Sequence, residues 1–172
     1  MEDLDIKPVG PEEAEDLLAV ARETFIDAFA SRNRPEDMEI YLRDVLSMQQ
    51  FAHQLTDPHR HFFLARIGQS IVGYLKLNTG SRQSDLRDPR SLEIERIYIL
   101  SPFQGEGIGK QLMIFAELFA RKRVISRIWL GVWEENIKAM EFYKKLGYRV
   151  FDSHVFMLGK DIQKDILMDL QL

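Results

Sequence analysis

The chain has 172 residues, of which 45% are hydrophobic and 29% are charged, and its formal net charge is −4. This size and composition predict a single domain over residues 1–172 with its own core, and the lack of cysteine excludes disulfides, thiolate metal sites and a cysteine nucleophile. The negative charge argues against a nucleic-acid partner. No apolar run approaches the about 18 residues that span a membrane, so we expect no membrane partner. The N-terminus does not resemble a signal peptide, so we expect a cytoplasmic location.

Hydrophobic periodicity divides the chain into alternating strands and helices. The first half predicts a short strand, two helices, and two strands joined by a tight turn, over residues 4–9, 11–30, 35–55, 61–67 and 70–77. A polar, turn-rich stretch over residues 78–91 is expected to be a loop. The second half predicts strand, helix, strand, helix and two closing strands, over residues 92–100, 107–123, 127–133, 136–146, 148–158 and 165–172. This order predicts one mixed α/β domain.

Three glycines, Gly105, Gly107 and Gly109, stand at alternate positions between an expected strand and an expected helix. They do not form a P-loop, because that motif needs serine or threonine where Gln111 stands. A dinucleotide-binding fingerprint matches poorly, since Lys110 replaces its last glycine. That alternative stays open because an acidic residue ends the next expected strand, as a ribose-binding acid would.

The pattern Gln104-x-x-Gly107-x-Gly109 brings unhindered backbone N–H groups to the positive end of a helix dipole. Such N–H groups bind phosphates, so the pattern predicts an anion cradle suited to a pyrophosphate, to which Lys110 can add positive charge. The alternative is a glycine-rich turn with only a structural role.

A second motif follows downstream in the order Asn136, Ala139, Phe142-Tyr143 and Gly147-Tyr148. At this order and spacing, the two motifs resemble those of the GNAT superfamily of acetyl-CoA-dependent N-acetyltransferases. The stretches "SLEIERIYI", "IWLGVWEEN" and "FYKKLGY", with the closing "SHVFMLGKD", are similar to PaiA-type bacterial polyamine acetyltransferases. This closer resemblance is dense from about residue 91 onward and absent around residues 47–60 and 79–90.

The resemblance implies a GNAT fold, which is a mixed, mostly antiparallel twisted sheet of about seven strands flanked by helices on both faces. It implies acetyl-CoA, or coenzyme A, as co-substrate and no metal, and none of the four histidines is assigned to a site. In the family the pantetheine arm adds to the backbone of a splayed strand, and the glycine loop takes the pyrophosphate. The implied cofactor contacts are Ile97, Tyr98, Ile99, Gln104, Gly105, Glu106, Gly107, Ile108, Gly109, Lys110, Asn136, Lys138, Tyr143 and Lys145.

Attack on a thioester needs a neutral amine, yet an alkyl ammonium with a pKa near 10.4 is neutral only about one time in a thousand at pH 7. A general base is therefore expected. Strand alternation places Glu93 and Glu95 on one face with Ile97 and Ile99. We expect Glu95 to act as base or to position a water, and Glu93 to bind or share the cationic substrate; the alternative is two surface acids. Family position implies that Tyr143 protonates the leaving thiolate, and the alternative is a core tyrosine.

Residues 1–50 hold 13 acidic and 5 basic side chains, and in GNAT folds the first two helices border the acceptor pocket. This acidity favours a polycation. We therefore expect acetyl transfer to a primary amine, first a polyamine such as spermidine or spermine, by direct attack in a ternary complex. The alternatives are another amine, such as an aminoglycoside, an amino acid or a protein N-terminus, and a catalytically weak acyl-CoA-binding regulator. The oligomeric state stays open, with a homodimer as one alternative.

Overall fold

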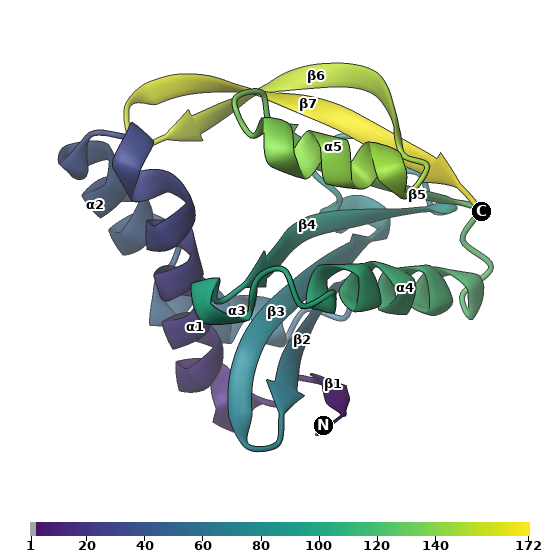
Figure 1. The fold of residues 1–172 in the computed structure, drawn as a ribbon, viewed down its shortest axis with the longest axis horizontal. Helices are drawn as coiled ribbons and strands as arrows, with labels where there is room; N and C mark the ends of the chain where they lie inside the picture. Colours follow the sequence, from purple (N-terminus) through teal and green to yellow (C-terminus); the bar gives the residue numbers. More distant parts are fainter. Residues whose placement is uncertain (1–2) are drawn as a thin grey trace.

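The computed structural model describes residues 3–172, which build one seven-stranded sheet in the order β1-β2-β3-β4-β5-β7-β6 (Figure 1). All neighbouring strands are antiparallel except β4 and β5, which are parallel. The strands are β1 (Leu4–Pro8), β2 (Arg60–Ile67), β3 (Ser70–Thr79), β4 (Ser91–Ile99), β5 (Arg127–Trp133), β6 (Arg149–Leu158) and β7 (Asp161–Gln171). The expected mixed, mostly antiparallel sheet is confirmed.

Five α-helices flank this sheet, and no helix among residues 3–172 is long and apolar enough to cross a membrane. The helices are α1 (Ala14–Phe29), α2 (Pro35–Asp44), α3 (Met48–Leu55), α4 (Ile108–Arg121) and α5 (Ile137–Lys145). Successive side chains of a strand point to opposite faces, so Leu75 and Leu77 pack in a core with α4 and α5, whereas Tyr74 packs in a second core with α1, α2 and α3. Helices therefore cover both faces, as expected.

The single helix expected over residues 35–55 is in fact two helices. Helix α2 ends at Asp44 with Val45 as its C-cap, and Ser47 is the N-cap of α3, because the Ser47 side chain accepts a hydrogen bond from the Gln50 N–H. Between them Leu46 is buried in the second core. The Ser-x-x-Gln spacing is a helix-start signal that periodicity alone does not detect.

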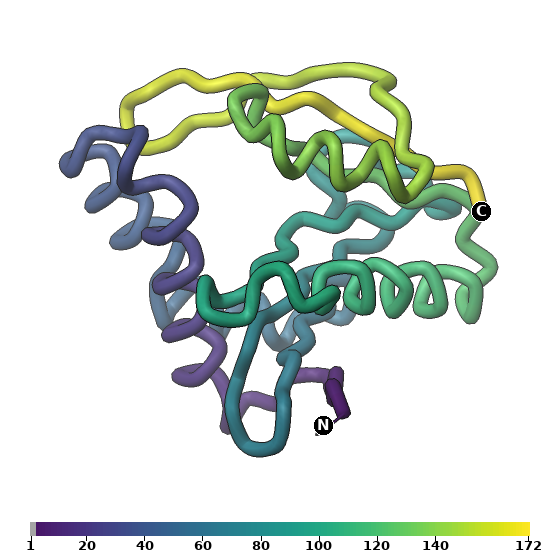
Figure 2. The backbone as a smooth tube through the Cα atoms, in the orientation of Figure 1, coloured from purple at the N-terminus to yellow at the C-terminus, as the bar shows by residue number. Residues whose placement is uncertain are grey.

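The β6–β7 hairpin reaches back to α2, far from it in the sequence (Figure 2). The Lys160 N–H donates to Asp37 Oδ1 at 2.7 Å. A Cβ at Gly159 would lie 2.4 Å from the Asp37 Cα, and the φ of Gly159 is +62°, so only glycine fits this contact. This contact holds the turn of the β6–β7 hairpin against α2.

Strand β4 carries a β-bulge at Glu95, which corrects the expected arrangement of its side chains. Lys76 of β3 pairs with Arg96, and Leu77 pairs with Ile94, so Glu95 is an extra residue. A bulge shifts the alternation by one residue. Ile97 therefore packs in the core with α4, whereas Glu95 points to the opposite face, where it contacts Lys76. The prediction that Glu93, Glu95, Ile97 and Ile99 share one face was wrong.

Candidate active site

The two parallel strands of the sheet separate at one end. Pairing between β4 and β5 ends where Ile94 meets Leu130, while β5 continues to pair with β7 as far as Trp133. Within the described part of the chain, residues 95–99 of β4 therefore have no neighbouring strand on the β5 side. An extended ligand can pair with such an edge as an added strand.

The open edge of β4 presents the backbone of two residues. Leu100 donates its N–H to the carbonyl of Val72 at 2.9 Å, and because backbone groups alternate in direction along a strand, Ile99 and Ile97 point toward the open side. The Gln104 side chain donates to the Ile99 carbonyl at 3.0 Å. This bond ties the loop to the strand end, at a position where a cofactor contact is expected.

The loop after β4 contains two glycines with left-handed backbone. The φ angles are +88° at Gly105 and +82° at Gly107, and a Cβ at either position would meet nothing within 4 Å. These positions need glycine because of backbone conformation and not because of crowding. The open space around them leaves the loop backbone accessible to a ligand.

The first turn of α4 completes this cradle. Its first helical hydrogen bond joins the Gln111 N–H to the Gly107 carbonyl at 3.2 Å, so the N–H groups of residues 108–110 have no acceptor within the helix. A Cβ at Gly109 would lie 3.3 Å from the Ile99 side chain, so glycine lets α4 begin close to β4. Free N–H groups at the positive end of a helix fit a pyrophosphate.

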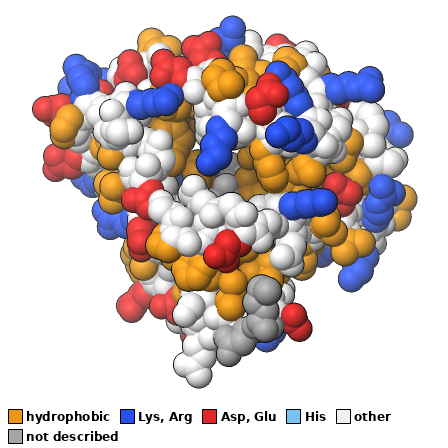
Figure 3. Space-filling view, in the orientation of Figure 1, with side chains coloured by type: hydrophobic (Ala, Val, Ile, Leu, Met, Phe, Trp, Pro, Cys, Tyr) orange, Lys and Arg blue, Asp and Glu red, His pale blue; other side chains and the backbone are white. Residues whose placement is uncertain are grey.

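The other expected cofactor residues come from the loop before α4, from α4 and from the start and body of α5. Asn136 is the N-cap of α5, because its Oδ1 accepts from the Ala139 N–H at 3.1 Å. Figure 3 shows a hollow with apolar walls between α5 and the loop before α4, with Lys and Arg side chains over α5. The exposed residues Glu106, Lys110, Lys138 and Lys145 come from the loop, α4 and α5.

Two expected contacts have their side chains inside the protein. Ile108, the first residue of α4, is buried in the core with α5. The ring of Tyr98 stacks on Tyr74, with 5.9 Å between ring centroids, in the core with α1, α2 and α3. Only the backbone of Ile108 is at the cradle, and the ring of Tyr98 lies on the opposite face of β4.

Replacing Gly107 by valine should lower the affinity for acetyl-CoA by about tenfold or more. A β-branched residue is strained at a φ of +82° by about 1–2 kcal/mol, and its side chain would occupy the space above the cradle. Gly68 in the β2–β3 turn has a φ of +58°, so Gly68→Val carries similar strain away from the site and should leave the affinity unchanged. Calorimetric titration measures both, and normal affinity in a folded Gly107→Val protein would contradict the cradle.

Tyr143 lies on α5, next to Tyr148 at 6.1 Å between ring centroids. It is 9% exposed and packs in the core with α4. Burial raises the pKa of Tyr143 to about 12, with no hydrogen-bonding contribution from another residue of the described chain. The phenol therefore keeps its proton at neutral pH and is not committed to a protein acceptor.

A polar network connects β3 and β4 on the face of the sheet that carries α1, α2 and α3. Lys76 Nζ lies 2.5 Å from Glu95 Oε2. The Asn78 side-chain amide donates to both carboxylates, at 2.6 Å to Glu95 and 3.0 Å to Glu93. Glu93 is 4% exposed, whereas the Glu95 side chain is 29% exposed. The two predicted acids are therefore adjacent, and Glu95 is the more accessible.

The network separates the pKa values of the two glutamates. Burial raises the pKa of Glu93 above its usual value. Burial acts on Glu95 in the same direction, but the positive charges of Lys76 and Arg96 outweigh it and lower the pKa of Glu95 to about 2. A carboxylate with so low a pKa is a weak base. This argues against Glu95 as the general base and makes Glu93 the better proton acceptor.

Sequence reasoning missed two residues of the network. Ser84 donates to Glu93 twice, from its hydroxyl at 2.7 Å and from its backbone N–H at 2.9 Å. Lys76 is 2% exposed. A single lysine within an apolar strand was a usable signal for Lys76, because a buried ammonium needs a partner. The loop that holds Ser84 carried no such signal.

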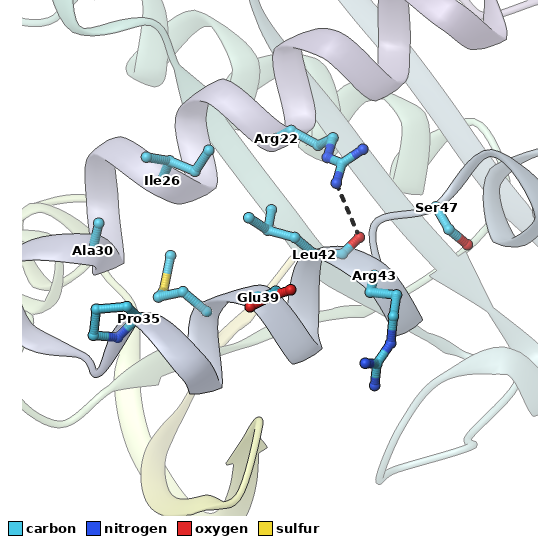
Figure 4. A pocket seen from close by; sticks show the side chains of 9 residues that line it. Arg22, Ile26, Ala30, Pro35, Glu39, Leu42, Arg43 and Ser47 are labelled. Carbon is cyan, nitrogen blue, oxygen red and sulfur yellow. Dashed lines mark hydrogen bonds between the residues drawn. The ribbon is translucent and has the colours of Figure 1, made fainter.

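A groove of about 720 Å³ lies elsewhere, between α1 and α2 (Figure 4). Apolar side chains line it together with Arg22, Arg43 and Glu39. Arg22 donates to the Leu42 carbonyl at 3.5 Å across the groove. With two guanidinium groups to one carboxylate, this groove does not suit a polycation, so the acidity of residues 1–50 does not make it an amine site.

Known structures share this fold. The crystal structure of PaiA N-acetyltransferase from Thermoplasma acidophilum in complex with coenzyme A matches with a TM-score of 0.80 and 22% identity, and the match covers 99% of each chain. The spermidine N(1)-acetyltransferase of Thermoplasma acidophilum is 23% identical over 154 residues, which is 87% of this chain and 91% of that protein.

Relatives with higher identity place the chain in a family. An uncharacterized N-acetyltransferase of Lactobacillus delbrueckii subsp. lactis is 40% identical over 163 residues, covering 95% of this chain and 94% of the relative. The sequence model of the acetyltransferase (GNAT) family matches residues 19–148, which include the open edge of β4, the glycine loop and α5. The chain therefore belongs to the GNAT family of acetyltransferases.

Proposed function

We propose that this acetyltransferase moves the acetyl group of acetyl-CoA to a primary amine and that its acceptor is a polyamine such as spermidine or spermine. The observation that carries the amine assignment is the pair Glu93 and Glu95, two acids joined by Asn78 beside the point where β4 and β5 separate. The polyamine assignment draws support from the spermidine acetyltransferase and PaiA similarities.

The cofactor side is built from backbone groups. Acetyl-CoA supplies the acetyl group as a thioester. In the proposal the N–H groups of residues 108–110 and the backbone of Gly105 and Gly107 hold the pyrophosphate, while Ile97 and Ile99 pair with the pantetheine amides. Lys110 of α4 and Lys138 and Lys145 of α5 are exposed and, in the proposal, add positive charge for the phosphates.

The acceptor side must attract a cation and then remove its proton. Glu95 stays ionised because its pKa is about 2, and its partly exposed carboxylate can accept a hydrogen bond from the ammonium in addition to its contact with Lys76. Glu93 has a raised pKa and accepts the proton, through a water, before the amine attacks. Attack is direct, because the chain contains no cysteine that could carry the acyl group. Tyr143 then donates its phenolic proton to the leaving sulfur, and the second proton that the nitrogen loses as the amide forms restores the phenol.

The first test is coenzyme A release, by thiol titration, from purified protein given acetyl-CoA and one amine at a time. The panel contains spermidine, spermine, putrescine, an aminoglycoside and a short peptide. Release driven best by spermidine or spermine is the expected result. Release driven by another amine would keep amine acetylation and discard the polyamine acceptor. Tight acetyl-CoA binding without release would favour an acyl-CoA-binding regulator, and Glu93→Gln is the matched inactive control.

A further inference from the structure

A histidine bridges two carboxylates beside the polar network, although the sequence assigns it no site. His154 of β6 bonds through Nδ1 to Asp85 of the loop before β4, and through Nε2 to Asp165 of β7 at 3.3 Å. We call His154, Asp85 and Asp165 the clasp. Burial alone would lower the pKa of His154, but the two carboxylates raise it above its usual value. A protonated imidazole donates from both nitrogens, so the clasp ties the loop to both strands.

Ser84, which precedes Asp85 of the clasp, hydrogen-bonds to Glu93. Ser84 supplies two of the three hydrogen bonds to the Glu93 carboxylate, and Asn78 of β3 supplies the third. The Ser84 hydroxyl also lies 3.3 Å from Asp85 Oδ2. Adjacent residues of one loop are thus anchored on different sides, Asp85 on β6 and Ser84 on β4.

We propose that His154 is a positioning residue, which acts through Asp85 and Ser84 to hold two hydrogen-bond donors on the Glu93 carboxylate and so sets the pH range in which Glu93 can accept a proton. The inference rests on the proposed function, in which Glu93 is the base on the acceptor side.

Hydrogen bonds to an ionised carboxylate favour the ionised form. When the clasp is broken, the loop around Ser84 is anchored chiefly through Gln83, whose side-chain oxygen accepts from Trp129 and Ser91. The two hydrogen bonds from Ser84 to Glu93 then weaken. The charged group that faces Glu93 across Asn78 is Glu95, whose negative charge also raises the pKa of Glu93. Once the hydrogen bonds from Ser84 weaken, mainly Asn78 is left to counter the effect of burial and of this charge, both of which raise the pKa of Glu93. Glu93 is then protonated over a wider pH range and cannot serve as base there.

The test is a carbon-13 NMR titration of the Glu93 carboxyl in the full-length protein. His154→Ala and Asp85→Ala break the clasp from opposite sides, and each should raise the pKa of Glu93 by about one unit, as should Ser84→Ala, since a hydrogen bond to a charged group is lost. His154→Gln keeps a neutral hydrogen-bond donor at this position and should raise the pKa of Glu93 less than His154→Ala does. The control is His53→Ala, which removes an exposed histidine of α3 and should change nothing.

Activity gives a second measurement. In His154→Ala, the acid limb of kcat/KM for the amine should move upward with the Glu93 titration, while KM for acetyl-CoA stays unchanged. A Glu93 pKa that is the same in wild type, His154→Ala and Asp85→Ala would overturn the inference. So would an acid limb of kcat/KM that shifts in His154→Ala while the pKa of Glu93 does not. If the NMR shift occurs but no amine is acetylated, the clasp stands and the proposed function fails.

Discussion

Replacing Tyr143 by phenylalanine should lower kcat by about 10²-fold or more, with little change in acetyl-CoA affinity or melting temperature. The hydroxyl has no hydrogen-bonding partner in the described chain, so its removal breaks no contact in the folded protein. Because the pKa of Tyr143 is about 12, the phenol is protonated throughout the neutral range. The rate ratio of wild type to variant should therefore be independent of pH there, measured as coenzyme A release under saturating substrates.

Tyr148→Phe is a matched control for this experiment. Tyr148 is also buried, its hydroxyl also lacks a hydrogen-bond partner within residues 3–172, and its ring lies 6.1 Å from that of Tyr143. The same atom is removed from the same core, yet kcat should stay near the wild-type value. Full activity of Tyr143→Phe would make Tyr143 a packing residue and remove it from the mechanism.

Replacing Glu95 by glutamine should lower the free energy of unfolding by about 3–5 kcal/mol near neutral pH, because a buried ion pair loses one partner. Lys76 would remain buried, 2% exposed, without the carboxylate that now lies 2.5 Å from its Nζ. For a chain of this length such a loss corresponds to a fall in melting temperature of about 10 °C. Denaturant unfolding of wild type and variant measures the difference.

The deficit of Glu95→Gln should shrink on both sides of neutral pH. The pKa of Glu95 is lowered from 4.5 to about 2, so the stability that Glu95 contributes is present above pH 4.5 and is lost from the wild type as pH falls toward 2. The pKa of Lys76 is lowered to about 8, so above that pH the lysine becomes neutral and no longer needs a counter-charge. An equal deficit at acid, neutral and alkaline pH would contradict the ion-pair explanation.

A double variant measures how strongly Lys76 and Glu95 stabilise each other. Lys76→Met leaves Glu95 with Arg96 at 3.6 Å and Asn78 at 2.6 Å, so it should cost less than Glu95→Gln. The combination Lys76→Met with Glu95→Gln should be more stable than Glu95→Gln alone, because the buried ammonium of Lys76 is no longer left without its carboxylate. Additive losses would mean that Lys76 and Glu95 are not coupled.

The glycine loop between β4 and α4 could be predicted from the sequence because it is local. The chain passes directly from β4 through the loop with Gly105 and Gly107 into α4. The φ angles of +88° and +82° at these two positions favour glycine, so the loop conformation can be recognised in the sequence. The cap at Asn136 is equally local, since its bond reaches only to Ala139. In both cases the residues that interact are close in the sequence.

The surroundings of Glu93 and Glu95 could not be predicted in the same way. Alternation predicted Glu95 on one face with Ile97, but an extra residue in the β4 ladder puts Glu95 on the other face. Periodicity contains no information on a bulge, because a bulge depends on how two strands pair. The expected role of Glu95 as base rests on that position, and its contact with Lys76 from a different strand argues for a fixed charge instead.

The sequence by itself determined most of the order of strands and helices, the family resemblance and the glycine loop before α4, because periodicity and backbone restrictions act over a few neighbouring residues. Only the tertiary structure decided the electrostatics around Glu93 and Glu95. The groups involved, Lys76, Glu95, Ser84 and His154, come from different strands and a loop. The pKa values of Lys76, Glu95 and His154 depend on burial and on charges that only folding brings within hydrogen-bond distance. Local sequence patterns do not specify these distances, and the fold does.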